Sequence, residues 1–233
     1  MNKEVLEQAK ARVGEQVAQW VTTGMVVGLG TGSTAAYAIR AIGRRVKEEG
    51  LRVTGVPTSY SAELLARMVG IPVATPGEVE RIDLAIDGAD EVDPELRLIK
   101  GRGAAHTRER IVAAMAERFV VVADFSKEVA QLGEKMPVPV EVLPFAWRPV
   151  ERSLQVLGGK PVLRMGMRKD GPVITDQGFW ILDVKFESMG DPREVASMLK
   201  TLPGVLDHGL FIDETTDVLI ATAEGTIVHR RRT

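Results

Sequence analysis

The sequence has 233 residues, of which 45% are hydrophobic and 27% charged, and its formal net charge at pH 7 is −2. The length allows one large domain or two modest ones, and the charge argues against nucleic acid as the main partner, because a phosphate backbone requires a strongly basic surface. The absence of cysteine excludes disulfides, thiolate zinc sites and cysteine nucleophiles. The three histidines lack metal-ligand spacing, so we expect no metal centre. We also expect a cytoplasmic protein without a membrane partner, because the chain shows neither a signal-peptide core nor an apolar run of about 20 residues.

The first half of the chain alternates helices and strands. Helical periodicity and helix-capping residues predict helices over residues 2–20, 33–50, 59–69 and 104–118. Short apolar runs predict strands over residues 25–29, 51–56, 71–74, 81–86 and 119–123. This alternation predicts a doubly wound, mostly parallel open sheet of the Rossmann-like α/β class. Ligands of such sheets bind beyond the carboxyl ends of the strands.

The pattern changes after Lys127. Residues 133–142 are rich in proline, which is typical of a domain boundary. Beyond them we predict helices and strands over residues 145–157, 162–167, 179–186 and 191–202. Their order is typical of a smaller split-βαβ, ferredoxin-like α+β domain.

Two further strands, residues 210–212 and 218–221, are expected to return to the first domain. We therefore predict a catalytic Rossmann-like domain of residues 1–132 and 207–233, and a small α+β domain of residues 133–206 that mediates oligomerisation. The arginines at residues 230–232 are interpreted as a solvated tail.

A glycine-rich loop, GLGTGST at residues 28–34, follows a predicted strand and opens a helix. A dinucleotide fingerprint would need glycine where the chain has Ser33, and a nucleotide P-loop would need a GK[ST] sequence. A loop rich in backbone N–H groups and hydroxyls at a helix start instead favours a cradle for a phosphate or a sugar hydroxyl over a purely structural turn.

An acidic loop, DGADEVD at residues 87–93, follows another predicted strand. It lacks the DxDxDG spacing of a calcium loop. Asp87 ends an apolar strand and the glycine after it frees the backbone to turn. We favour acid/base chemistry and hydroxyl recognition for Asp87 and Asp90 over the alternative, ordinary solvated loop carboxylates.

A third loop begins where an apolar run ends at Lys100 and a glycine-rich turn leads into a helix. We expect the ammonium group of Lys100 to be held near this turn; the alternative is an ordinary surface lysine. Glu109 falls at the edge of the apolar stripe of the helix, where a partly shielded carboxylate could act as a base, and spacing alone leaves open that it is simply solvated. We expect the three loops to form one site for a phosphorylated, polar small molecule.

Five segments in this order, GLGTGSTA, DGADEVD, KGRGAAHTRE, ADFSK and PVPVEVLPFA, resemble the A-type ribose-5-phosphate isomerases, as do the later segments GPVITDQGFWILD and LPGVLDHGLF. The resemblance implies an aldose–ketose isomerase of the non-oxidative pentose phosphate pathway. It would interconvert D-ribose 5-phosphate and D-ribulose 5-phosphate through a cis-enediolate, without a cofactor or metal. It also implies a homodimer or a higher homo-oligomer.

The resemblance makes Glu109 the proton acceptor and places Lys100 at the developing oxyanion. It implies substrate contacts from the three loops and from one later lysine: Thr31, Gly32, Ser33, Thr34, Asp87, Gly88, Ala89, Asp90, Lys100, Gly101, Arg102, Gly103 and Lys127. Asp87 would assist ring opening, Asp90 would position hydroxyls, and Lys127 is the candidate for the phosphate. The chain departs from the family at Arg102, usually glycine, and at His106, usually leucine, which we do not assign as a second base.

Two alternative functions remain open at this stage. A non-catalytic sugar-phosphate sensor is one, although the sequence offers no DNA-binding helix pair outside the core. An aminosugar-phosphate deaminase of related fold is the other, and release of ammonia would distinguish it.

Overall fold

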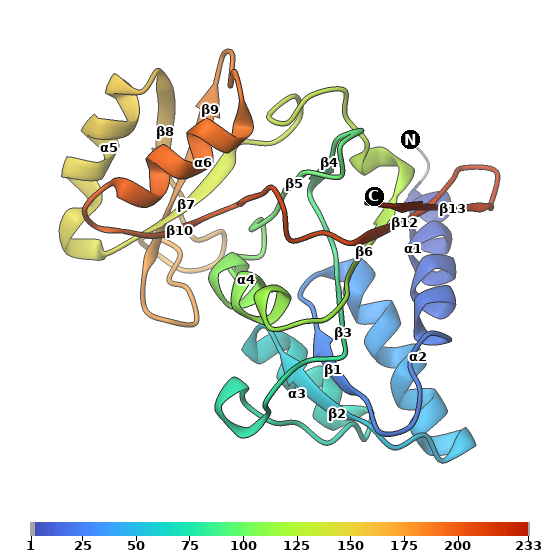
Figure 1. The fold of residues 1–233 in the computed structure, drawn as a ribbon. Coiled ribbons are helices and arrows are strands. Elements are labelled where there is room, and N and C mark those ends of the chain that lie inside the picture. The colour runs from blue at the N-terminus through green and yellow to red at the C-terminus, as the bar shows by residue number, and fades with distance from the viewer. Residues whose placement is uncertain (1–2, 233) are drawn as a thin grey trace. The chain divides into compact units, whose positions relative to one another are not determined.

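The computed structural model describes residues 3–232, so the first residue of the predicted helix 2–20 lies outside the described part. The chain divides into two compact units (Figure 1). The first unit comprises Met1–Ala89, Arg108–Glu128 and Glu214–Thr233, and the second comprises Asp90–Thr107 and Val129–Asp213. Within residues 3–232, no helix is both long enough and apolar enough to cross a membrane.

A six-stranded sheet forms the centre of the first unit. Its strands are β1 (Val26–Leu29), β2 (Thr54–Pro57), β3 (Leu84–Asp87), β6 (Phe119–Asp124), β12 (Asp217–Ala221) and β13 (Ile227–Arg231). They lie in the order β13-β12-β6-β3-β1-β2, and every neighbouring pair is parallel except β12 with β13. The helices of this unit are α1 (Lys3–Ala18), α2 (Ser33–Glu49), α3 (Tyr60–Met68) and most of α4 (His106–Ala114). The predicted doubly wound, mostly parallel sheet is therefore confirmed.

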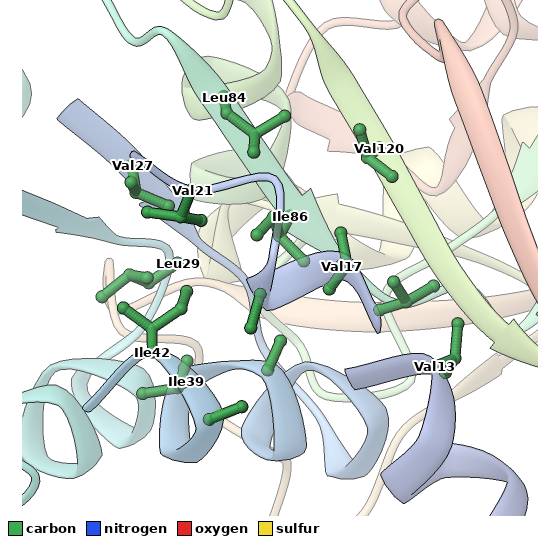
Figure 2. Close-up of a cluster of buried hydrophobic side chains, with 14 of the residues drawn as sticks. Val13, Val17, Val21, Val27, Leu29, Ile39, Ile42, Leu84, Ile86 and Val120 are labelled. Carbon is green, nitrogen blue, oxygen red and sulfur yellow. The ribbon is translucent and has the colours of Figure 1, made fainter. Parts of the chain in front are cut away.

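Apolar side chains from α1, α2 and the central strands form the core of the first unit. Figure 2 shows labelled members of this buried cluster: Val13, Val17, Val21, Val27, Leu29, Ile39, Ile42, Leu84, Ile86 and Val120. Burying each such side chain contributes roughly 1.5–3 kcal/mol relative to leaving it exposed. All residues of β6 are buried, as expected for a strand covered on both faces. This packing fixes the positions at which the strands end.

The second unit contains a four-stranded antiparallel sheet with two helices. Along the chain its elements are β7 (Val138–Val142), α5 (Trp147–Val156), β8 (Gly159–Leu163), β9 (Trp180–Phe186), α6 (Pro192–Thr201) and β10 (Val205–His208). The strand order β10-β7-β9-β8 and the sequence βαββαβ are those of a ferredoxin-like fold, which confirms the predicted α+β class.

A small three-stranded sheet also belongs to the second unit. It pairs β4 (Glu91–Val92), β5 (Leu98–Ile99) and β11 (Leu210–Phe211) in the order β11-β5-β4. Short 3-10 helices complete the chain: η1 (Pro76–Glu78), η2 (Phe125–Lys127) and η3 (Pro144–Ala146). The expectation that residues 210–212 return to the first domain is therefore wrong, because β11 pairs with β5 and both strands belong to the second unit.

Three other local predictions are also wrong. Residues 71–74 form no strand and make only an isolated bridge between Val73 and Gly55. Residues 138–142, interpreted from their prolines as a boundary, form β7, because their alternating valines are buried and Pro139 still offers its carbonyl to Gly209 N–H at 2.7 Å. The arginines near the end of the chain are not a free tail, because β13 pairs with β12 and Arg230 binds Glu128.

A buried carboxylate ties this last hairpin to the rest of the first unit. Asp217 accepts hydrogen bonds from Arg118 Nε at 2.7 Å and from Thr216 Oγ1 at 2.8 Å, and it lies 2.7 Å from His229 Nε2. The Arg118 guanidinium also stacks over the ring of Trp20, 4.3 Å from its centroid. Burial raises the pKa of Asp217, but the hydrogen bonds from Arg118, His229 and Thr216 outweigh it and hold this pKa well below its usual range.

We expect Asp217→Asn to lower the free energy of unfolding by about 2 kcal/mol near neutral pH, because the guanidinium loses its anionic partner. The effect stays below that of a fully buried pair because Arg118 is 36% exposed and remains hydrated. The pKa of Asp217 is depressed in the folded state. Its charge therefore contributes fully to the free energy of unfolding above the unfolded-state pKa of about 4, and this contribution is lost as the pH falls further. Urea unfolding measured from about pH 7 to pH 3 should therefore show a decreasing difference in the free energy of unfolding between wild type and variant.

A matched control for this experiment is Asp213→Asn, which removes the partner of Arg193 in an exposed pair. It should change stability by less than about 1 kcal/mol. A gap for Asp217→Asn that is equally large at every pH would contradict the role given to its charge.

Candidate active site

The parallel sheet of the first unit reverses its winding between β1 and β3. From β1 the sheet continues through β2, and from β3 it continues through β6 and β12. The loops that follow β1 and β3 therefore diverge at a topological switch point, where open α/β sheets bind their ligands. The predicted loop at residues 28–34 and the start of the predicted loop at residues 87–93 both leave the sheet here.

Asp87 holds these two loops together. It is the last residue of β3 and only 2% exposed, and its Oδ1 accepts hydrogen bonds from Thr31 N–H at 3.0 Å and Gly88 N–H at 2.7 Å. Glycine is required at Gly30, because any side chain there would collide with the Asp87 carboxylate. Asp87 is thus an oriented, buried carboxylate and not a solvated loop residue.

Hydroxyl groups extend this arrangement on the other side of Thr31. Thr31 Oγ1 donates to Ser59 Oγ at 2.7 Å and shares a 2.7 Å hydrogen bond with Thr58 Oγ1. Ser59 also caps α3 by accepting from Ala62 N–H at 3.1 Å. Thr58 and Ser59 are not among the site residues predicted from the sequence. The sequence feature that could have indicated them is their position, as two adjacent hydroxyl residues shortly after a predicted strand of the same sheet.

The start of α2 is open to an anion. Its N-cap is Gly32, with φ +111° and no side chain to cap the helix. Ser33 and Gly32 are exposed, whereas Thr34 is buried. The first backbone N–H groups of a helix have no partner within that helix, and the helix dipole adds positive potential there. This geometry suits a phosphate or another anionic oxygen.

Glu109 lies in the first turn of α4 and is only 4% exposed, so it is not a solvated residue of a helix surface. The arginines beside it are engaged elsewhere in the first unit: Arg108 stacks over the ring of Tyr60 at 4.5 Å, and Arg110 binds Glu214. The helix is shorter than the predicted 104–118, since it begins at His106 and ends at Ala114.

Lys127 ends η2, directly after β6. Because β6 is parallel to β3, this lysine belongs to the same carboxyl edge of the sheet as Asp87 and Gly88. Asp124 begins the turn by accepting from Ser126 N–H at 3.0 Å. The first unit therefore supplies an oriented carboxylate, a buried glutamate, an open helix start and a lysine. Ala89 directly follows Gly88 and ends the first segment of this unit.

In the second unit, Lys100 follows β5 and is 2% exposed, so it is not an ordinary surface lysine. Its backbone N–H donates to Gly209 O at 2.8 Å, and its Nζ lies 5.6 Å from the centroid of the Phe211 ring. A lysine held against an aromatic ring by cation–π attraction has a restricted position. Lys100 is therefore an oriented cation.

The turn after Lys100, residues 101–103, is bound by Asp90 of the same unit. Asp90 Oδ2 accepts from Arg102 N–H at 2.9 Å, and Asp90 N–H donates to Ile99 O at 2.8 Å. Arg102 and Gly103 are exposed. The side chain of Arg102 thus lies at the surface and not inside the turn.

His106 lies under this turn in the same unit. It is completely buried, and its Nε2 is 3.8 Å from Oε2 of the equally buried Glu141, which Thr107 also contacts. A Cβ on Gly101, whose φ is +105°, would fall 2.6 Å from His106 Nδ1. The ring therefore packs against the turn at Gly101.

We expect Gly101→Ala to lower kcat about tenfold or more and to destabilise the protein by about 2–4 kcal/mol, because it combines an unfavourable φ with a collision against His106. Gly178→Ala is the control. Gly178 has φ +85° but nothing within 4 Å of an added Cβ, so it should show only the backbone cost of about 1 kcal/mol. Thermal unfolding and steady-state kinetics would measure both, and equal effects would contradict this account of the turn.

Within residues 3–232, no group of three or more histidine, aspartate or glutamate side chains is placed to hold a metal ion. The first unit thus presents buried Glu109 and Asp87, and the second presents buried Lys100. Carboxylates of this kind can act as acids or bases, and a lysine of this kind can stabilise a negative oxygen.

Comparison with known proteins identifies the family. Residues 54–225 match the family model described as ribose 5-phosphate isomerase A (phosphoriboisomerase A). The chain belongs to the ribose 5-phosphate isomerase A family. This confirms the resemblance found in the sequence motifs.

Individual relatives agree over almost the whole chain. It is 52% identical over 221 residues to ribose-5-phosphate isomerase A of Thermosynechococcus vestitus, with 94% of each chain covered. It is 54% identical to that of Methanosarcina acetivorans, covering 94% of this chain and 92% of the relative. Similarity at this level over this length carries the fold as well as the motifs.

Solved structures give the same result. A ribose 5-phosphate isomerase A from Methanocaldococcus jannaschii has a TM-score of 0.93 and 46% identity, covering 99% of this chain and 100% of that one. A D-ribose-5-phosphate isomerase in complex with phospho-erythronic acid has a TM-score of 0.95 and 45% identity, with 100% of both chains covered. The comparisons favour neither the sensor nor the deaminase alternative.

Proposed function

We propose that this chain interconverts D-ribose 5-phosphate and D-ribulose 5-phosphate through a cis-enediolate, as a step of the non-oxidative pentose phosphate pathway. The observation that carries the proposal is its similarity to enzymes of that name along almost its entire length. The buried Glu109 and the buried, oriented Asp87 and Lys100 support it, because isomerisation needs a base, a proton carrier and a cation.

Glu109 is the general base in this proposal. Its carboxylate removes the proton from C2 of the open-chain aldose. The electrons of the broken C–H bond form the C1–C2 double bond, and those of the C1 carbonyl move onto O1. After the proton on O2 has moved to O1, the enediolate collapses to the ketose. An electron pair on O2 forms the C2 carbonyl, and the electrons of the C1–C2 double bond take the proton back from Glu109 to form the new C1–H bond. Shielding from water favours such a step, and Glu109 is 4% exposed.

Lys100 stabilises the negative oxygen of the enediolate, and the turn at residues 101–103 contributes backbone donors. One well-placed donor of this kind is often worth about a hundredfold or more in rate. Asp87 assists opening of the sugar ring and moves protons between O1 and O2. Asp90 positions substrate hydroxyls.

The phosphate of the substrate is assigned to Lys127 and to the loop donors at the start of α2. This loop comprises Thr31, Gly32, Ser33 and Thr34, and Gly88 and Ala89 supply further substrate contacts from the neighbouring loop. An open helix start and a lysine are complementary to a dianion. The oxidation of C2 and the reduction of C1 balance within the substrate, so the reaction requires no nicotinamide. In this proposal the cation at the negative oxygen is Lys100, so no metal is needed there.

The experiment that tests the proposal is conversion of ribose 5-phosphate to the ketose by purified, chelator-treated protein with no cofactor added. We expect full activity. A sample that is inactive and revives with one divalent ion would contradict the cofactor-free mechanism. Release of ammonia from an aminosugar phosphate, without isomerisation of ribose 5-phosphate, would support a deaminase instead.

We further propose that the protein acts in the cytoplasm as a homodimer or a higher homo-oligomer, with residues 133–206 providing the contact surface. Several large apolar side chains of these residues are exposed, including Phe145 at 94% and Met167 at 98%. Exposed apolar surface of this kind often marks an interface between chains. Light scattering should show at least two chains per particle, and a particle with the mass of one chain at working concentration would contradict it.

A further inference from the structure

Arg164 contacts the turn that follows Lys100, although it lies far along the chain. It belongs to the second unit and comes directly after β8. Its guanidinium forks onto Asp183 of β9, with Nε donating to Oδ2 at 2.8 Å and Nη2 donating to Oδ1. This pair fixes the plane of the guanidinium, because an arginine and a carboxylate match each other bidentately.

The remaining nitrogen, Nη1, donates to two backbone carbonyls of the turn. It lies 2.9 Å from Gly101 O and 3.1 Å from Arg102 O. Both acceptors belong to the glycine-rich turn to which we assign backbone contacts with the substrate. A lysine could not reproduce this arrangement, because it has no planar fork to bind Asp183 while pointing another donor at the turn.

These contacts determine where the N–H groups of the turn point. In a trans peptide the C=O and the N–H of the next residue point in opposite directions. With both carbonyls facing Arg164, the N–H groups of Arg102 and Gly103 point away from it. The Arg102 N–H binds Asp90 Oδ2 at 2.9 Å, whereas the Gly103 N–H has no hydrogen bond among residues 3–232. Gly103 is also exposed, so its N–H can serve an external acceptor.

A cation on the carbonyl side of a peptide also polarises it and strengthens the hydrogen bond that its N–H donates. We propose that Arg164 is a positioning residue of the isomerase reaction: it orients and polarises the 102–103 peptide so that the Gly103 N–H binds the negative oxygen of the enediolate. The inference rests on the proposed function. Asp183 serves it by fixing the guanidinium, and neither side chain touches the substrate.

The experiment compares Arg164→Met, Arg164→Ala and Arg164→Lys with the wild type in steady-state kinetics. We expect kcat to fall about 10- to 100-fold, less than for direct loss of an oxyanion donor, with KM changing less than about threefold. Inhibition by phospho-erythronic acid, whose carboxylate carries a negative charge near the reacting carbons, should weaken about tenfold or more. Inhibition by inorganic phosphate should not change, because the phosphate contacts come from other residues.

Rescue with guanidinium ion separates positioning from a merely structural role. Added guanidinium should restore part of the kcat of Arg164→Ala, and methylammonium should restore less, because only guanidinium reproduces the fork. If Arg164 had only a structural role, its replacement would lower thermal stability, leave kcat per folded molecule unchanged and show no rescue by guanidinium. Arg193→Met is the matched control, since Arg193 also forks an aspartate, Asp213, and neither residue is assigned a role in the reaction. It should retain wild-type kinetics.

An NMR measurement that requires no turnover tests this inference independently of the proposed function. In protein labelled with ¹⁵N-glycine, the amide signal of Gly103 should shift in Arg164→Lys and in the milder Asp183→Asn, while that of Gly178 should not. Wild-type kcat and wild-type inhibition by phospho-erythronic acid in Arg164→Met would overturn the inference, as would an unmoved Gly103 signal. Absence of isomerase activity in the wild type together with a shifted Gly103 signal would overturn the proposed function and leave the geometry of the turn supported.

Discussion

Glu109→Gln is expected to abolish turnover while leaving substrate binding nearly intact. Glutamine keeps the size of the side chain and one acceptor oxygen, but it cannot take a proton at neutral pH. A positioned general base contributes about 10²–10⁴-fold in rate, roughly 3–5 kcal/mol of barrier. The variant should therefore lose at least about a hundredfold in kcat, with KM within about threefold of the wild type.

Burial makes this prediction specific, because Glu109 is 4% exposed and a solvated helix residue would tolerate the change within a factor of a few. The control is Glu117→Gln in the same unit, which removes the charge of an exposed glutamate paired with Arg81. Its kinetics should match those of the wild type. Thermal unfolding of both variants would show whether loss of activity reflects chemistry or loss of the fold.

Lys100→Met is expected to have the second-largest effect, a loss of about 10²–10³-fold in kcat. Methionine fills a similar volume against the Phe211 ring and preserves the backbone hydrogen bond to Gly209, so the turn should stay folded. What disappears is the positive charge that we propose to stabilise the enediolate. Because this charge matters most in the transition state, KM should change less than kcat.

Two other lysine variants serve as comparisons for Lys100→Met. Lys127→Ala should act mainly on KM, because Lys127 is assigned to the phosphate, which is bound equally in the ground state and the transition state. Lys185→Met makes the same substitution at an exposed lysine of β9 and should be silent. An equal loss of kcat in Lys100→Met and Lys127→Ala would contradict the separation of their roles.

The sequence predicted the loops after β1 and β3 well because their signals are local. A short apolar run that ends in glycine and polar residues marks both the end of a strand and a turn, and parallel strands bring such turns to one edge of the sheet. Asp87 could be selected for this reason before any partner was visible. The hydrogen bond from Thr31 N–H to Asp87 Oδ1 at 3.0 Å is the structural consequence of that pattern.

The burial of Glu109 and the role of Arg164 could not be predicted in this way, because both depend on partners distant in the chain. Helical spacing placed Glu109 at the edge of an apolar stripe and left its exposure open. Arg164 is separated from Gly101 by 63 residues, and nothing in its own segment distinguishes it from other arginines. Only tertiary packing shows which of many charged side chains is buried or bound.

The errors in secondary structure have a similar origin. The prolines around β7 suggested a boundary, yet Pro139 fits the strand because its carbonyl is the group that binds Gly209. The arginines of β13 suggested solvent, yet their backbone pairs with β12 over the register Asp217 to Ala221. In both cases pairing with another strand outweighed local composition.

Exchange of the C2 proton of ribose 5-phosphate with deuterated solvent, followed by NMR, tests the central claim most directly, because it reports the proton transfer itself. The account predicts that the wild type exchanges this proton and that Glu109→Gln does so at least about a hundredfold more slowly, while still binding phospho-erythronic acid. Exchange by the variant near the wild-type rate would show that Glu109 is not the base.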